Sequence, residues 1–232
     1  MSIPVSEWYD SIGSYTFPSV FVRLTKEQIE GFLNQEVKTM KFLKERFAYV
    51  IKHLPGACFV HADICAPNDS SVFTQLNGSV RKAEDAIALL QESYKVKHAL
   101  AEGTTDRIVF HPYRRMDRYR EFRLFIHGGE LQAVSQRYLT RYLARMQGRE
   151  EELWYLAAYL TDDIRDFLPE TNVVIDVYLT TSKKLMIIDL NKWGGDTDPL
   201  LYGSWEVQEE KQGKVLLTQK PTSISGDVSV SF

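Results

Sequence analysis

The chain has 232 residues, of which 44% are hydrophobic and 25% charged, and its formal net charge at pH 7 is −3. These values are ordinary for a globular protein and give no global sign of nucleic-acid or membrane-surface binding. No apolar run approaches the roughly 18 residues that span a bilayer, and the first residues lack the basic flank and apolar block of a secretory signal. Cys58 and Cys65 form no metal-binding or paired pattern, so we expect a cytoplasmic protein with free thiols.

The first half of the chain is rich in helical patterns. The run "SVFVRL" (19–24) predicts a strand, and Thr25 with Gln28 forms a capping-box pattern at the start of a helical periodicity. Apolar residues at three- and four-residue spacing over 25–54 predict one long helix or two collinear helices, ended by Pro55-Gly56. The segment 57–63 is typical of a strand, 66–71 of a loop and 81–100 of a second amphipathic helix.

From residue 107 the pattern changes to strands. The run "RIVFH" (107–111) is followed by two alternating runs around Gly128-Gly129, and this glycine pair predicts a tight hairpin. Residues 139–167 predict another helix, ended at Pro169. Residues 173–191 predict a second hairpin, which a Gly/Asp-rich loop (194–199) follows.

A helix-rich first half followed by antiparallel hairpins favours an α+β fold with mixed or antiparallel sheets over a doubly wound parallel sheet. We expect two lobes, a helix-rich one over residues 1–105 and a second over 106–207. A tail over 208–232 is expected to hold a last strand and a disordered end. Ligands often bind between lobes of this kind, so the cleft between them is the expected site.

The second hairpin, "VVIDVYLTTSKKLMIIDLN", holds two acids inside apolar runs. A turn centred on Ser182-Lys183 places Thr181 opposite Lys184 and Asp176 opposite Asp189, with Asn191 on the same face. The opposite face, expected to be core, holds Val173, Ile175, Val177, Ile188 and Leu190. Because like charges opposite one another repel, these three oxygen-bearing side chains predict a site for a hard divalent cation, best Mg²⁺.

Two other interpretations of this hairpin stay open. One is an exposed sheet edge with hydrated acids, and a one-residue shift of the turn would take Asp176 out of register. The other is a nuclease site built on an Asp-x-Lys strand. Asn191 stands two residues after Asp189 and Lys192 is on the other face, which weakens the nuclease interpretation.

Two arginines of the first hairpin are candidate ligands for phosphate or carboxylate. Pairing across Gly128-Gly129 predicts Arg123 opposite Val134 and Arg137 opposite Arg120. Both arginines could lie on one sheet surface, although this pairing does not by itself require it. With the acids of the neighbouring hairpin they would form a magnesium–nucleotide site. The alternative for "RRMDRYREFR" (114–123) is a solvated basic face.

These motifs resemble a known family. The series "EFRLFIHGGELQAVSQRY" and "VIDVYL…LMIIDLNKWGGDTDPLLYGSWEV" is similar to the cell division cycle protein 123 family, a divergent ATP-grasp group, and the resemblance extends over about residues 8–206. It implies an ATP-grasp-like two-lobed fold that binds ATP and Mg²⁺ in the cleft. It implies a metal set of Asp176, Asp189 and Asn191, and places Arg123 and Arg137 near the phosphates or the activated substrate.

The resemblance also implies an adenine-binding hinge with backbone hydrogen bonds and an apolar slot. The residues of this expected cofactor site are His61, Val109, Phe110, His111, Tyr113 and Arg123. Where the family usually has a phosphate-contacting lysine, this chain has His61, and where the hinge usually reads Arg-Lys-Trp it has His111, Pro112 and Tyr113. A histidine in place of lysine predicts weaker or pH-dependent ATP binding.

The resemblance implies two classes of function. One is an ATP-dependent carboxylate–amine ligase or protein-modifying enzyme, with Arg123 and Arg137 as catalytic residues and a protein or peptide as substrate. The other is an assembly chaperone for translation initiation factor two that uses ATP structurally. The absence of a long acidic C-terminal extension favours a compact bacterial or viral relative and, with it, the ligase. A metal-dependent nuclease is a distant third, and we expect no membrane or nucleic-acid partner.

Overall fold

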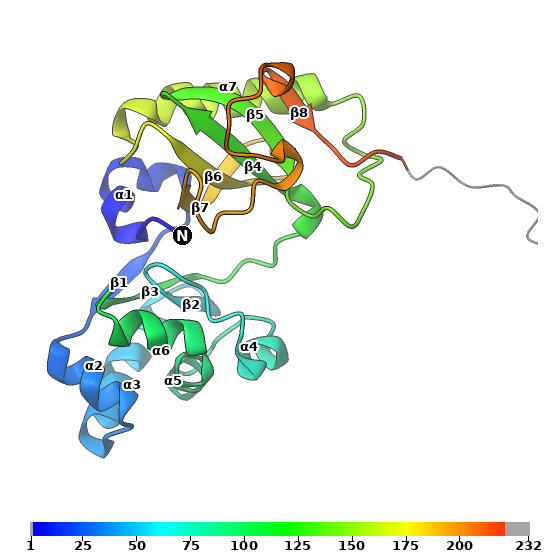
Figure 1. Cartoon of the computed structure of the whole chain (residues 1–232). Helices are drawn as coiled ribbons and strands as arrows, with labels where there is room; N and C mark the ends of the chain where they lie inside the picture. The colour runs from blue at the N-terminus through cyan, green and yellow to red at the C-terminus, as the bar shows by residue number, and fades with distance from the viewer. Residues whose placement is uncertain (1, 221–232) are drawn as a thin grey trace, which may run out of the picture.

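The computed structural model describes residues 2–220 and contains two sheets, each with helices packed against it (Figure 1). The first sheet is antiparallel and has the order β1 (Val20–Arg23), β3 (Arg107–Pro112), β2 (Cys58–Ala62). The second has the order β7 (Leu185–Lys192), β6 (Val173–Leu179), β4 (Glu121–His127), β5 (Glu130–Gln136), β8 (Lys214–Leu216), and β8 runs parallel to β5. The predicted α+β class with mixed and antiparallel sheets is confirmed.

Helices cover one face of the first sheet. They are α2 (Lys26–Leu33), α3 (Val37–His53), α4 (Ser71–Leu76), α5 (Ala83–Glu92) and α6 (Tyr94–Ala101). Their apolar faces bury Leu43, Phe47 and Phe110, and the rings of Phe47 and Phe110 meet edge to face with 5.0 Å between centroids. Because strand side chains alternate, the neighbours of these core residues, Phe59 and His111, lie on the opposite face of the sheet.

The second sheet is covered by α1 (Val5–Ile12) and α7 (Glu150–Ile164). Trp8 and Ile12 of α1 are buried in one cluster with Ile175 and with residues of α7. On the other face, Phe125 stacks on Tyr202 with 4.7 Å between centroids. Short 3-10 turns complete the fold: Gly13–Tyr15, Arg118–Arg120, Arg165–Phe167, Leu200–Tyr202 and Glu209–Lys211.

The two lobes are not simply the two halves of the sequence. Residues 3–12, expected in the first lobe, belong to the core of the second, and Figure 1 shows α1 beside β6 and β7. The strand β3, expected in the second lobe, is the middle strand of the first sheet, and β8, expected in the tail, joins the second. Residues 221–232 of the predicted tail lie outside the described part.

The two predicted long helices are each broken in two. The segment 25–54 divides at residues 34–36, where Gln35 has a φ of +56°, and α2 keeps the predicted Thr25–Gln28 capping box. The segment 81–100 divides at Ser93, whose hydroxyl accepts a hydrogen bond from Val96 N and caps α6. Residues 139–149 form turns rather than helix, and α1 and α4 were not predicted. No helix in residues 2–220 is long and apolar enough to cross a membrane.

Both predicted hairpins form, and each contains a β-bulge. Asp176 does pair with Asp189, but Thr180 rather than Thr181 faces Lys184, and a bulge after Asp176 restores the register. Because of this bulge Ile187 is buried in the core, whereas Ile188, predicted there, faces the cavity between the sheets. In the first hairpin a bulge at Phe125/Ile126 places Arg123 opposite Ser135 instead of Val134.

We predict that Trp8→Ala lowers the free energy of unfolding by about 3–5 kcal/mol, because it opens a cavity where α1 meets the second sheet. Urea unfolding of the whole chain measures this change. The exposed neighbour Glu7 is the control, and Glu7→Ala should change stability by less than about 0.5 kcal/mol. Equal effects of the two changes would mean that α1 does not anchor this core.

Candidate functional site

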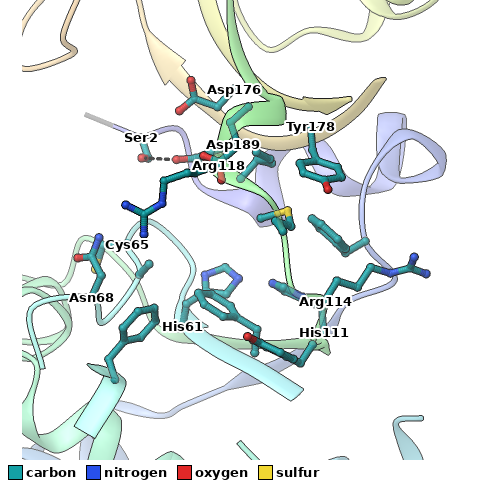
Figure 2. Close-up of a pocket in the computed structure, with 18 of the residues that line it drawn as sticks. Ser2, His61, Cys65, Asn68, His111, Arg114, Arg118, Asp176, Tyr178 and Asp189 are labelled. Atoms are coloured by element: carbon teal, nitrogen blue, oxygen red, sulfur yellow. Dashed lines mark hydrogen bonds between the residues drawn. The ribbon is translucent and has the colours of Figure 1, made fainter. Parts of the chain in front are cut away.

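A cavity of about 1460 Å³ lies between the two sheets. Figure 2 shows Asp176, Asp189 and Ser2 on one wall and His61, Cys65 and Asn68 on the facing wall. Of the residues expected in the site, eight line this cavity: His61, His111, Tyr113, Arg123, Arg137, Asp176, Asp189 and Asn191. The sheets therefore bring together side chains that are up to 130 positions apart (191 − 61).

Val109 and Phe110, expected at the adenine hinge, do not line the cavity. The strand β3 pairs with β1 on one edge and with β2 on the other, so the sheet already uses the backbone groups of both residues. The ring of Phe110 points away from the cavity, toward Phe47. Beyond Phe110, His111 and Pro112 pair only with β2, and the amide of Tyr113 donates to Ala57 O at 2.7 Å.

Asp176 is neutralised by two arginines. The guanidinium of Arg123, directly opposite on β4, donates through Nε to Oδ1 at 2.7 Å and through Nη2 to Oδ2 at 2.9 Å. Arg137 Nε lies 3.2 Å from Oδ2. Asp176 is 1% exposed and Arg123 6%, so this two-point pair is buried, where hydrogen bonds of this geometry fix orientation.

Arg123 and Arg137 differ in whether their guanidinium groups can still bind a ligand. Arg123 also donates through Nη1 to the carbonyl oxygen of Asp198 at 2.5 Å, so each of its nitrogens already has an acceptor. Arg137 is about two-fifths exposed and its Nη1 contacts Glu121 Oε2 at 2.8 Å. Burial alone would lower the pKa of the Arg137 guanidinium, but Asp176 and Glu121 outweigh it and raise the pKa above its usual value. Arg123 is thus held in a structural pair, and Arg137 is the arginine open to a ligand.

Asp189 faces Asp176 across the sheet and has no ion pair within 4.0 Å among the described residues. Its Oδ2 accepts a hydrogen bond from Ser2 Oγ at 2.8 Å, and Ser2 Oγ also lies 3.1 Å from Asn191 Oδ1. Burial, and next the charge of Asp176, raise the pKa of the Asp189 carboxyl to about 7. One hydroxyl proton thus faces two acceptor oxygens, which leaves this corner of the cavity rich in unneutralised oxygen.

These oxygens suit the magnesium ion that the family resemblance implies. Carboxylate and amide oxygens are hard ligands, and a cation would relieve the repulsion between Asp189 and Asp176. Among the described residues no group of three or more His, Cys, Asp or Glu side chains is placed to hold a metal. With two carboxylates and one amide, the set matches sites where Mg²⁺ also takes ligands from phosphates, rather than a complete protein cage.

The facing wall carries a group of stacked aromatic rings. The ring of His111 lies between those of Phe17 and Phe59, with centroid distances of 4.9 and 5.0 Å, and the ring of His61 is 5.5 Å from it. Burial lowers the pKa of His61 to about 4, and burial together with His61 lowers that of His111 to about 3. Both histidines are neutral at physiological pH, so His61 does not replace the cation of the family's lysine.

The N-terminal segment contributes residues that the sequence did not indicate. Ile3 N donates to Leu190 O at 2.7 Å, which places Ser2 beside Asp189 and Asn191. Ser6, four residues after Ser2, donates through its amide and its hydroxyl to the two carboxylate oxygens of Asp63, which directly follows β2. No spacing or composition distinguishes these serines, since their role depends on contacts with residues far away in sequence.

We predict that Asp176→Asn destabilises the fold by about 3–5 kcal/mol, because Arg123 is left buried without its counter-charge. Chemical denaturation measures the change. The paired control is Arg123→Met with Asp176→Leu, which removes both charges and should cost less than Asp176→Asn alone. A double variant less stable than the single one would contradict this account of the pair.

The neutral histidines predict a pH dependence of stability. A histidine in the unfolded chain titrates near 6.5, so below that pH the unfolded state binds protons that folded His111 does not. Stability is therefore lost as pH falls. Between about pH 7 and 5, His111 should account for a loss on the order of 1–2 kcal/mol, allowing for its partial exposure. His111→Phe should remove that part of the pH dependence in denaturation curves. An unchanged pH slope would show that His111 titrates normally.

The chain is similar in sequence to proteins of one known family. The model of the D123 family matches residues 21–223. A translation initiation factor eIF2 assembly protein of Xenopus laevis is 27% identical over 171 residues, which cover 67% of this chain and 50% of that protein. A putative CDC123-like protein of Acanthamoeba polyphaga mimivirus is 24% identical over 247 residues, 94% of this chain and 75% of that one.

Among solved structures, Cdc123 from Schizosaccharomyces pombe has a TM-score of 0.78 at 22% identity, with 94% of this chain and 95% of that chain covered. This likeness establishes the shared fold. The chain spans about half the length of the first curated eukaryotic relatives that it matches. The family model covers most of the sequence, and we conclude that the chain belongs to the D123 family and shares the α+β fold of Cdc123.

Proposed function

We propose that this protein binds a magnesium–nucleotide, ATP by the family resemblance, in the cavity between its sheets and acts as an assembly factor for a translation initiation factor. The observation that carries the proposal is the position of Asp189, an unneutralised carboxylate beside Asn191 that faces an aromatic slot across the cavity. Acidic oxygens opposite a stack of flat rings suit a ligand with a metal-bound phosphate at one end and a base at the other.

Each residue of the site would contact a different part of the bound magnesium–nucleotide. Asp189 and Asn191, with Asp176 beside them, would hold Mg²⁺, which would neutralise phosphate charge when bound. Arg137, the exposed arginine of the pair that holds Asp176, would contact phosphate oxygens. The ring of Phe59 and the edge of His111 would contact the base, since Phe17 and Phe59 cover the two faces of His111. Arg123 would act only by orienting Asp176.

The relatives support an assembly function over other uses of a nucleotide. The matched proteins of Xenopus laevis and Danio rerio are both named translation initiation factor eIF2 assembly proteins. A translation-factor partner and a cytoplasmic location are part of the same proposal. A nuclease has little support, because Lys192 is exposed and lies 3.8 Å from Glu170, away from the acids.

A carboxylate–amine ligase is the second candidate, and the size of the cavity favours it. At about 1460 Å³ the cavity is larger than the roughly 300–1,000 Å³ of ordinary ligand pockets, so a nucleotide leaves space for a second molecule. Such a ligase would consume ATP in the presence of a carboxylate and an amine. An assembly factor would bind ATP without this turnover and would bind purified translation initiation factor two.

We predict that ATP with Mg²⁺ raises the melting temperature of the wild-type chain by about 5 °C or more at saturating concentration, and that Asp189→Asn abolishes the rise. Mg²⁺ without nucleotide should produce little change, because the protein supplies too few ligands to bind it tightly. Without ligand, Asp189→Asn should be at least as stable as wild type, since it removes repulsion with Asp176.

The matched control is Asp196→Asn, which removes the same charge from the exposed loop after β7 and should leave the rise intact. If Asp189→Asn keeps the full rise, the proposed metal site is refuted. Two measurements then separate assembly from ligation. Isothermal titration calorimetry with purified initiation factor two measures partner binding, and phosphate release in mixtures of carboxylates and amines measures ATP turnover. Binding without turnover supports the first and turnover supports the second.

A further inference from the structure

Four exposed arginines stand at and beside the rim of the cavity. Arg114, Arg115 and Arg118 follow β3 and line the cavity, and Arg141 lies in the turns after β5. Figure 2 shows Arg114 and Arg118 among the side chains around the cavity. We call Arg118, Arg141 and the two tyrosines between them, Tyr119 and Tyr138, the arginine–tyrosine cluster.

The cluster is held together by its own contacts. The guanidinium of Arg118 lies over the ring of Tyr138 at 5.2 Å, and that of Arg141 over the ring of Tyr119 at 4.6 Å. The two rings meet edge to face with 5.3 Å between centroids, and Arg141 Nη1 donates to Tyr119 Oη at 2.8 Å. The side chains are therefore ordered before any ligand arrives, which lowers the entropic cost of binding.

The charge of these arginines is not neutralised within the described residues. Within residues 2–220, no carboxylate lies within 4.0 Å of Arg114, Arg115, Arg118 or Arg141. The nearest acid in sequence, Asp117, accepts from Tyr119 N and caps the 3-10 turn Arg118–Arg120. By contrast, Arg123 and Arg137 each form an ion pair with a carboxylate of the second sheet. A chain of net charge −3 thus presents four unpaired guanidinium groups on one rim.

We propose that the arginine–tyrosine cluster and the adjoining rim bind an acidic segment of a partner protein, whose chain would enter beside the nucleotide. The proposal rests on the proposed function in that the partner is the protein being assembled. Guanidinium forks held at fixed positions match the carboxylates of Asp and Glu. The cavity has space beyond a nucleotide, so such a segment and ATP can be bound together.

A nucleic acid fits this surface less well. Single strands bind where aromatic faces are free to stack on bases. Here the guanidinium of Arg141 covers a face of Tyr119 and that of Arg118 covers a face of Tyr138, while the edge contact brings the two rings together. The overall negative charge of the chain also opposes a long polyanion, whereas a short acidic segment needs only the local field of the rim.

The test uses the full chain, saturated with ATP and Mg²⁺, and fluorescence anisotropy of three labelled probes. The probes are a short peptide of alternating Glu and Ser, the same peptide with Gln for Glu, and oligouridylate of similar length. We expect the acidic peptide to bind most tightly, with an affinity that falls as salt rises. Arg141→Glu should weaken it by about tenfold, and Arg141→Lys, which keeps the charge but loses the fork, by a smaller factor.

The matched control is Arg81→Glu, the same reversal at an exposed arginine that has no ion pair within 4.0 Å in the part of the chain that the structure describes. It should change the affinity less than about twofold. Arg141 does not line the cavity, so Arg141→Glu should keep the ATP-dependent rise in melting temperature, which separates this proposal from the nucleotide site. The proposal is overturned if the Gln peptide binds as tightly as the Glu peptide, if oligouridylate binds more tightly than both, or if Arg81→Glu and Arg141→Glu have equal effects.

Discussion

The buried pair between Arg123 and Asp176 sets the electrostatics of the whole cavity. It joins two neighbouring strands of the second sheet through two parallel hydrogen bonds, and both side chains are almost fully removed from solvent. A buried charge must be compensated, and Arg123, together with Arg137, offsets the negative charge of Asp176. Its negative charge then acts on Asp189, 13 positions further along the chain (189 − 176), which forms no ion pair with an arginine among residues 2–220. Among these residues, Asp189 is thus left without a counter-charge at the cavity wall because the arginines pair with Asp176 beside it.

The positions of the bulges decide which side chains share this surface. Without a bulge after Asp176, the register from the turn would place Asp189 out of line with Asp176, and the two acids would not face each other. The bulge lets Ile187 reach the core while Asp189 and Asn191 stay on the side of Arg123 and Arg137. The bulge in the neighbouring hairpin likewise sets Arg123 opposite Ser135 and Arg137 opposite Glu121, while the unshifted pairing of β4 with β6 places Arg123 opposite Asp176. Two local irregularities therefore position the charged groups that the regular pattern could place only approximately.

The sequence predicted what depends on pattern within a strand or turn. Alternation around Gly128-Gly129 and within 173–191 was enough to place both hairpins, and the motifs were enough to predict the family. The pairing of Asp176 with Asp189 was correct although the turn was misplaced by one residue, because the bulge after Asp176 compensates for that shift. Breaks at Gln35 and Ser93 were missed, since neither residue stops a helix by composition alone.

What could not be predicted from sequence depends on contacts between distant segments. The neutral state of His111 follows from the rings of Phe17 and Phe59 on either side of it, which come from separate parts of the chain. The structural role of Arg123 follows from an acceptor in the loop after β7, the carbonyl oxygen of Asp198. Propensity and periodicity describe neighbours along the chain, so they carry no information on either contact.

The N-terminal segment connects the two walls of the cavity. Through Ile3 it is hydrogen-bonded to β7 in the second sheet, and through Ser6 it is hydrogen-bonded to Asp63 at the end of β2 in the first. A few residues thus connect both walls, and Asp63 is itself buried, so these bonds are shielded from water. The walls are held at a fixed separation by the protein alone. A nucleotide would then enter a cavity that is already formed, so its binding would not include the free-energy cost of bringing the two lobes together.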